Sequence, residues 1–212
     1  LKIYRLLPVL LISLVLCGCR GAKLSVADEQ MARGEYFDAS KTYRKIYNKL
    51  TKREERPLRG EVAFKMGECY RQLGMSARAS AAYQNALRYG YPDSTAYLHM
   101  AQTMHEEGRY AQAIAAYGDY LDLDPDSRIA RTGLAGANMA QEMKKNPTRY
   151  VVKQPRLLNS RRADFSPMYN GSDHDVLYFT TTNEKVMGTN RSEITGMKKS
   201  DIWFTRKNER GE

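Results

Sequence analysis

Asp173, His174 and Asp175 form the cluster in this sequence that is best suited to acid–base chemistry. A histidine flanked by carboxylates can take up and release protons near neutral pH. No nucleophile motif, glycine-rich phosphate loop or metal-ligand spacing accompanies the cluster, and it falls in an expected turn. We therefore expect no catalytic residue, no cofactor and no metal site in this protein.

The cysteines indicate neither a metal site nor a disulfide framework. Cys17, Cys19 and Cys69 have no ligand spacing with the three histidines. Cys17 and Cys19 are also too close in sequence for a C-x-x-C redox pair. Cys69 falls within an expected helix, which predicts a buried side chain that behaves as a small apolar group.

The N-terminal segment 1–19 has the parts of an export signal. Lys2 and Arg5 precede the apolar stretch 6–16, which is shorter than the about 20 residues that a membrane span needs. It ends in Leu16-Cys17-Gly18-Cys19, which resembles the lipobox of bacterial lipoproteins.

The lipobox resemblance implies cleavage before Cys19 and lipid attachment to that cysteine. Arg20 follows it in place of the aspartate that often retains lipoproteins in the inner membrane, so we expect an outer-membrane anchor facing the periplasm. Several acyl chains together hold a protein firmly to a leaflet. An ordinary secretory signal with an incidental cysteine is the alternative.

A glycine, an alanine five residues later and a tyrosine four further recur three times. The copies are Gly34, Ala39, Tyr43; Gly74, Ala79, Tyr83; and Gly108, Ala113, Tyr117. They lie 40 and 34 residues apart, and Gly67, Tyr70 and Pro125 extend the pattern. The glycine suits a tight turn, the alanine a close helix approach, and the tyrosine lies on the same face as the alanine.

A period of 34 with these residue types resembles the tetratricopeptide repeat, in which helix pairs stack into a solenoid. We expect a mainly α fold of about three repeats with helices at about 23–33, 36–50, 58–73, 76–89, 94–107, 110–122 and 127–143. The last helix is predicted to cap the array, and residues 51–56 to form a charged loop or an added helical turn.

The resemblance also implies a binding groove, because the first helix of each repeat lines the concave surface in that family. The corresponding residues are Phe64, Glu68, Arg71, Gln72, Leu98, His99, Gln102 and His105. Their mixed, charge-balanced character favours a protein partner over nucleic acid. Each of them is alternatively an ordinary exposed residue of a helix.

Residues 144–162 contain seven basic and no acidic side chains and carry much of the net charge of +10. Such a segment can meet phosphate, lipid headgroups or an acidic protein surface, but it is more often a solvated linker. Export disfavours nucleic acid as its partner. We expect an extended linker between two domains.

Residues 163–212 have β character. The segments 176–181 and 201–205 are rich in β-branched and aromatic residues, and 163–167 adds a third motif. Together they resemble the first blade of a periplasmic β-propeller, which cannot stand alone. The sequence opens with Leu in place of Met and stops just after a strand, so we expect further blades beyond Glu212.

The predicted domains are thus 1–19 signal, 20–143 repeats, 144–162 linker and 163–212 incomplete propeller. This order resembles the OmpA-family, PorE-like lipoproteins of Bacteroidetes that are associated with type IX secretion. The resemblance implies a non-catalytic scaffold in a cell-envelope complex, with peptidoglycan bound by an OmpA-like C-terminal domain that is not among residues 1–212. A chaperone or assembly lipoprotein whose groove captures outer-membrane or secreted proteins is the alternative.

Overall fold

The computed structural model describes residues 23–153 and 158–208, which fold as two compact units. The first unit ends at Pro147 and the second begins at Thr148, within the predicted linker. The predicted signal segment 1–19, with Cys17 and Cys19, lies outside the described residues. None of the described helices has the length and hydropathy that a membrane crossing requires.

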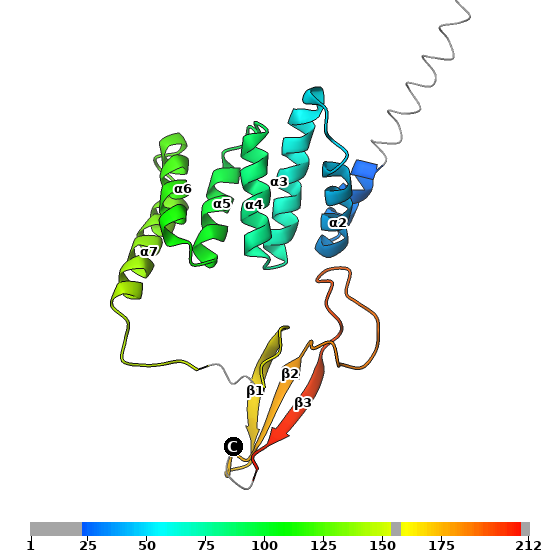
Figure 1. The fold of residues 1–212 in the computed structure, drawn as a ribbon, viewed down its shortest axis with the longest axis vertical. Helices are drawn as coiled ribbons and strands as arrows, with labels where there is room; N and C mark the ends of the chain where they lie inside the picture. Colours follow the sequence, from blue (N-terminus) through cyan, green and yellow to red (C-terminus); the bar gives the residue numbers. More distant parts are fainter. Residues whose placement is uncertain (1–22, 154–157, 209–212) are drawn as a thin grey trace, which may run out of the picture. The chain divides into compact units, whose positions relative to one another are not determined.

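The first unit is an α-solenoid, as the repeat pattern predicts. A helix over 23–32 is followed by α2 (Tyr36–Tyr47), α3 (Arg56–Gln72), α4 (Ser76–Arg88), α5 (Thr95–Glu106), α6 (Tyr110–Leu123) and α7 (Arg128–Lys145). Successive helices run in opposite directions and stand side by side in a row (Figure 1). Each helix packs mainly on its neighbours in the sequence.

A glycine closes the turn within each helix pair. Gly34, Gly74 and Gly108 have φ values of +78°, +65° and +71°, a left-handed conformation that strains residues with a side chain. Around Gly74, the Met75 amide donates to the Tyr70 carbonyl at 2.9 Å, which satisfies the end of α3. The chain can therefore reverse within a few residues and begin the second helix.

The helix ends differ from the expected ones by more than one residue at three places. α2 stops at Tyr47 because the chain turns there and buries Leu50, which is 3% exposed. The charged segment 51–56 contains a 3-10 turn, η2 (Arg53–Glu55), that leads directly into α3. α7 extends to Lys145, so two residues of the predicted linker are helical, where their positive charges suit a helix C-terminus.

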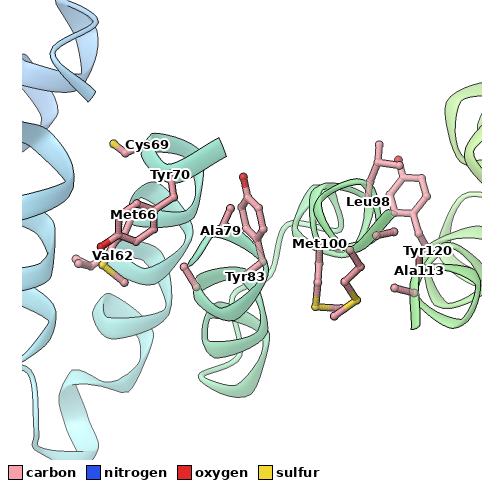
Figure 2. Packing of buried hydrophobic residues seen from close by; sticks show 14 of the residues in the cluster. Val62, Met66, Cys69, Tyr70, Ala79, Tyr83, Leu98, Met100, Ala113 and Tyr120 are labelled. Carbon is pink, nitrogen blue, oxygen red and sulfur yellow. The ribbon is translucent and has the colours of Figure 1, made fainter. Parts of the chain in front are cut away.

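Alanines and tyrosines build the core between the helices. The repeat alanines Ala39, Ala79 and Ala113 are fully buried, and Tyr43 and Tyr83 are buried with them. Figure 2 shows Tyr83 packed beside Ala79, with Met66, Tyr70 and Val62 of α3 nearby. The small side chain lets two helices approach, and the large one fills the space that remains.

Cys69 of α3 lies in the same core, fully buried and without a disulfide (Figure 2). Its thiol therefore packs as the small apolar group that the sequence predicts. Burial, aided by the charge of Glu68, raises the pKa of the thiol to about 12. The ionised, reactive form is strongly disfavoured in the folded protein.

The second unit contains an antiparallel sheet in the order β1 (Asp164–Asn170), β2 (Val176–Thr181), β3 (Asp201–Arg206) (Figure 1). Its register pairs Tyr178 with both Met168 and Phe204. A bulge between Phe165 and Met168 interrupts the first pair of strands. Within the described residues the sheet has three strands, whereas a propeller blade has four.

Candidate functional site

Glu68 of α3 joins three helices through its carboxylate. The Tyr83 hydroxyl of α4 donates to Oε1 at 2.5 Å, and His99 of α5 donates to the same oxygen from Nδ1 at 2.6 Å. Arg71, one turn along α3, binds Oε2 at 2.8 Å. Since an ionised carboxylate only accepts hydrogen bonds, the proton in the His99 contact belongs to the imidazole. We call these four residues the Glu68 cluster.

The hydrogen bonds of this cluster keep Glu68 charged. Its side chain is 13% exposed. Burial by itself would raise the pKa of Glu68, but hydrogen bonds from His99, Arg71 and Tyr83 outweigh it and lower the pKa to about 2. Burial and the bond to Glu68 raise the pKa of Tyr83, so its hydroxyl keeps its proton. The cluster is therefore a fixed, ionised joint between two repeats at neutral pH.

An aromatic wall borders the Glu68 cluster. Phe64 stacks on Tyr91 with ring centres 4.4 Å apart and planes at 16°. Its ring also lies nearly parallel to His99, at 6.3 Å, and tilted against Tyr83 at 5.8 Å. An apolar surface thus adjoins a charged one, a combination that suits the mixed chemistry of a polypeptide.

Beyond the cluster, the first helices of two repeats and the second helix of the later repeat line an open pocket of about 480 Å³. Its walls are Arg71, Gln102, His105, Glu106 and Tyr117. The Arg71 Nε atom is buried and has no hydrogen-bond partner among the described residues.

The structure brings most of the predicted groove residues together. Phe64, Glu68, Arg71 and His99 meet around the cluster, and Gln102 and His105 line the pocket with Arg71. Gln72 is exposed at the end of α3.

Leu98 requires a correction. It is 7% exposed and belongs to the core, because α5 lies between α4 and α6 and Leu98 points into that packing (Figure 2). Conversely, Tyr91 and Glu106 contribute to the surface although the repeat pattern does not single them out. The sequence signal that could have identified Tyr91 is its aromatic side chain directly before Pro92.

The preceding repeat junction has the same construction. The Tyr43 hydroxyl donates to Asp28 at 2.5 Å, and Lys65 of the next repeat binds that carboxylate at 2.9 Å. Glu68 and Tyr83 lie 40 residues after Asp28 and Tyr43, at the equivalent positions of the next repeat. His99 lies 34 residues after Lys65, which is again the equivalent position. An acid, a tyrosine and a basic residue thus hold each of the first two junctions.

The following junction lacks this arrangement. Its equivalent residues are Gln102, Tyr117 and Gly133. The tyrosine ring fills the space beside Gly133, where a Cβ would overlap it. In the described residues the Tyr117 hydroxyl makes no hydrogen bond, and its ring contacts His105 edge-on at 6.3 Å. The open pocket coincides with the junction where Gln102 stands in place of the acid of the earlier junctions.

The cluster of Asp173, His174 and Asp175 lies in an exposed turn between β1 and β2. His174 has a φ of +53° and its ring packs edge-on against Tyr169. Asp173 accepts from Ser172, and Asp175 faces Lys207 at 3.9 Å. Across 23–153 and 158–208, no group of three or more His, Cys, Asp or Glu side chains is placed to hold a metal ion.

Comparison with known families supports the periodicity. A sequence model of the tetratricopeptide repeat matches residues 61–94 and 95–127. Each of these two segments therefore resembles a tetratricopeptide repeat in its sequence. They comprise α3 with α4 and α5 with α6, the helix pairs that carry the Glu68 cluster and the open pocket. No curated protein matches the sequence.

A solved structure has a similar fold over the helical array. The structure of the UNC-45 chaperone, solved for its features critical for binding and folding muscle myosin, aligns with a TM-score of 0.50 and 16% identity over 60% of this chain. The alignment covers 14% of the UNC-45 chain.

Two further structures are the first tetratricopeptide domain of human RPAP3 and that of Spaghetti bound to an HSP90 peptide. The RPAP3 domain has a TM-score of 0.49 and 18% identity, over 61% of this chain and 97% of its own. The Spaghetti domain has a TM-score of 0.47 and 17% identity, over 58% of this chain and 93% of its own.

Proposed function

We propose that this protein is a non-catalytic scaffold that binds an extended segment of a protein partner along α3 and α5. The observation that carries the proposal is the surface formed by the aromatic wall, the Glu68 cluster and the open pocket. That surface combines stacked rings with the charged and polar side chains that line the open pocket. A polypeptide offers both apolar side chains and carbonyl acceptors, whereas a small apolar ligand offers apolar surface without the acceptors.

The rigidity of the surface supports binding. Glu68 ties α3, α4 and α5 together, so the helices that present the groove are held before a partner arrives. Preorganisation lowers the entropic cost of association. In the neighbouring pocket Gln102 stands in place of the acid that closes the earlier junctions, and this pocket is open to a partner.

Affinity capture with the full chain tests this function. We compare the unmodified protein with a Gln102→Ala/His105→Ala variant, which removes two side chains of the pocket. Gln84→Ala is the control, because Gln84 is exposed on α4 outside the pocket. We expect a few fixed partners that are lost only in the double variant, with circular dichroism unchanged.

The same experiment separates the scaffold from the alternative. Capture of many unfolded outer-membrane or secreted chains would favour a chaperone or assembly factor. Capture that is identical for all three proteins would contradict a binding role for the groove.

We further propose that Cys19 carries a lipid that anchors the protein at the periplasmic face of the outer membrane, in an envelope complex of the type IX secretion kind. The support is the lipobox resemblance of 16–19 and the arginine that follows it. We expect palmitate labelling and globomycin-sensitive processing, both lost in Cys19→Ser. A Cys17→Ser variant that loses the label while Cys19→Ser keeps it would contradict the assignment.

A further inference from the structure

A second pocket, of about 260 Å³, lies where α2 meets the turn between α3 and α4. Lys41 and Arg44 of α2 and Arg78 of α4 line it, so three positive charges surround one small space. Lys41 is bonded to Asp38 at 3.2 Å. Arg44 and Arg78 make no ion pair within the part of the chain that the structure describes. The basic pocket has no lining residue in common with the open pocket or the Glu68 cluster.

The remaining walls of the basic pocket are largely apolar. Phe37, Tyr70 and Met75 line it, together with Ser40, which is 4% exposed. The Ser40 hydroxyl donates to the Phe37 carbonyl at 2.8 Å. A ligand that fits must therefore present an anionic group beside apolar surface.

At the next repeat junction, the chain itself supplies a carboxylate beside the equivalent serine. There the Ser80 hydroxyl donates to Glu107 Oε1 at 2.7 Å, and Arg109 binds Glu107 Oε2 at 3.2 Å. By the repeat spacing of 40, Ser80 corresponds to Ser40. By the spacing of 34, Glu107 corresponds to Leu73.

The earlier junction therefore keeps the serine and gains three basic side chains, but it has lost the carboxylate that they would bind. Charged donors of this kind bind carboxylates with short, strong hydrogen bonds. Arg44 and Arg78 line one pocket and have no ion pair among the described residues, so an anion bound between them would be stabilised.

We propose that the basic pocket binds an acidic side chain of a polypeptide partner, whose carboxylate pairs with its arginines as Glu107 pairs with Arg109 at the following junction. A free inorganic anion would meet the three basic groups but would leave Phe37, Tyr70 and Met75 uncovered. An acidic residue next to an apolar one covers both. This contact is separate from the groove, so a partner can engage either surface alone.

Fluorescence anisotropy of the full chain with a labelled peptide of alternating glutamate and leucine tests the proposal. The Arg44→Glu/Arg78→Glu variant should weaken binding about tenfold or more, since charge-assisted hydrogen bonds are lost and repulsion replaces them. Lys45→Glu/Arg88→Glu is the matched control: it reverses two exposed charges on the same two helices outside the pocket. It should retain most of the affinity, and circular dichroism should be unchanged in both.

Two further arms define what would overturn the proposal. The equivalent glutamine–leucine peptide should not bind, and inorganic phosphate at the peptide's own concentration should not displace the glutamate peptide. Equal weakening by both double variants would show attraction to net charge alone. Displacement by phosphate would indicate a free-anion site. Loss of peptide binding in Gln102→Ala/His105→Ala would place the peptide in the groove, and would leave the proposed function standing while this proposal fails.

Discussion

The Tyr83 hydroxyl lies 2.5 Å from the Glu68 carboxylate, fifteen positions earlier in the sequence, and Tyr43 stands in the same relation to Asp28. The repeat tyrosine thus has two functions. Its ring fills the space between two helices, and its hydroxyl binds an acid of the helix before it. The third copy, Tyr117, keeps only the first of these functions, because the equivalent position is Gln102.

This difference predicts unequal effects of removing the hydroxyl. Tyr83→Phe should lower the free energy of unfolding by about 1.5–3 kcal/mol, the usual contribution of a hydrogen bond to a charged group. Tyr117→Phe should change it little, since the Tyr117 hydroxyl has no partner among the described residues. Urea unfolding of both variants measures the difference, and equal losses would contradict the role assigned to Glu68.

Glu68 should make stability depend on pH in the acid range. Its pKa is about 2 in the folded protein against an ordinary 4.5, so the unfolded chain binds a proton first as the pH falls. The contribution is present above the unfolded pKa, is worth about 3 kcal/mol there, and is lost as the pH falls towards 2.

Thermal unfolding of Glu68→Gln alongside the unmodified chain isolates this contribution from that of other carboxylates. We expect the variant to be less stable at neutral pH, and the gap between the two proteins to narrow steadily between about pH 5 and pH 2. A gap of constant size would show that the charge of Glu68 is not what the cluster depends on.

Gly67 of α3 is required by the position of the Tyr83 ring. A Cβ added there would lie 2.7 Å from Tyr83 Cε1, and the ring is fully buried and held by its hydroxyl. Gly67→Ala should therefore destabilise the array by about 1–3 kcal/mol through overpacking. Gly118→Ala is the control: nothing lies within 4 Å of its Cβ position, so helix propensity should raise stability by about 0.5–1 kcal/mol.

Cys69 should resist alkylation until the array opens. It is fully buried, and its pKa is raised to about 12, so both access and thiolate formation are suppressed. Iodoacetamide in mildly alkaline buffer, followed by peptide mapping, should label Cys69 only when urea is added. Rapid labelling of the native protein would contradict the packing of α3.

The periodic features of the fold could be predicted because each repeats a local requirement. Gly74 and Gly108 mark turns, and Ala79 and Ala113 mark close helix contacts. Their spacing therefore predicts where the helices lie and the order in which they stack. The contacts of Glu68 could not be predicted in this way. They join residues of three helices, and their geometry depends on how one repeat is rotated against the next.

Exposure was also harder to predict than helix position. Leu98 and His99 are neighbours on α5, yet the first is in the core and the second binds Glu68. A repeat position indicates which side of a helix a residue occupies, but the depth of burial depends on the flanking helices. In the second unit, β-branched and aromatic runs indicated β2 and β3, whereas the bulge in β1 follows from Ser166, whose φ is +52°.

Almost all contacts of the first unit join helices that are adjacent in the sequence, with α5 and α7 the more distant pair. A chain with such short-range contacts closes few long loops as it folds, so its folding should be fast. The free energy of unfolding then comes from each repeat and from its interfaces with the adjacent repeats. Unfolding that starts at one end of the array therefore spreads one repeat at a time. The Glu68 cluster couples α3, α4 and α5 in the middle of the row, and exchange of amide hydrogens should be slowest there.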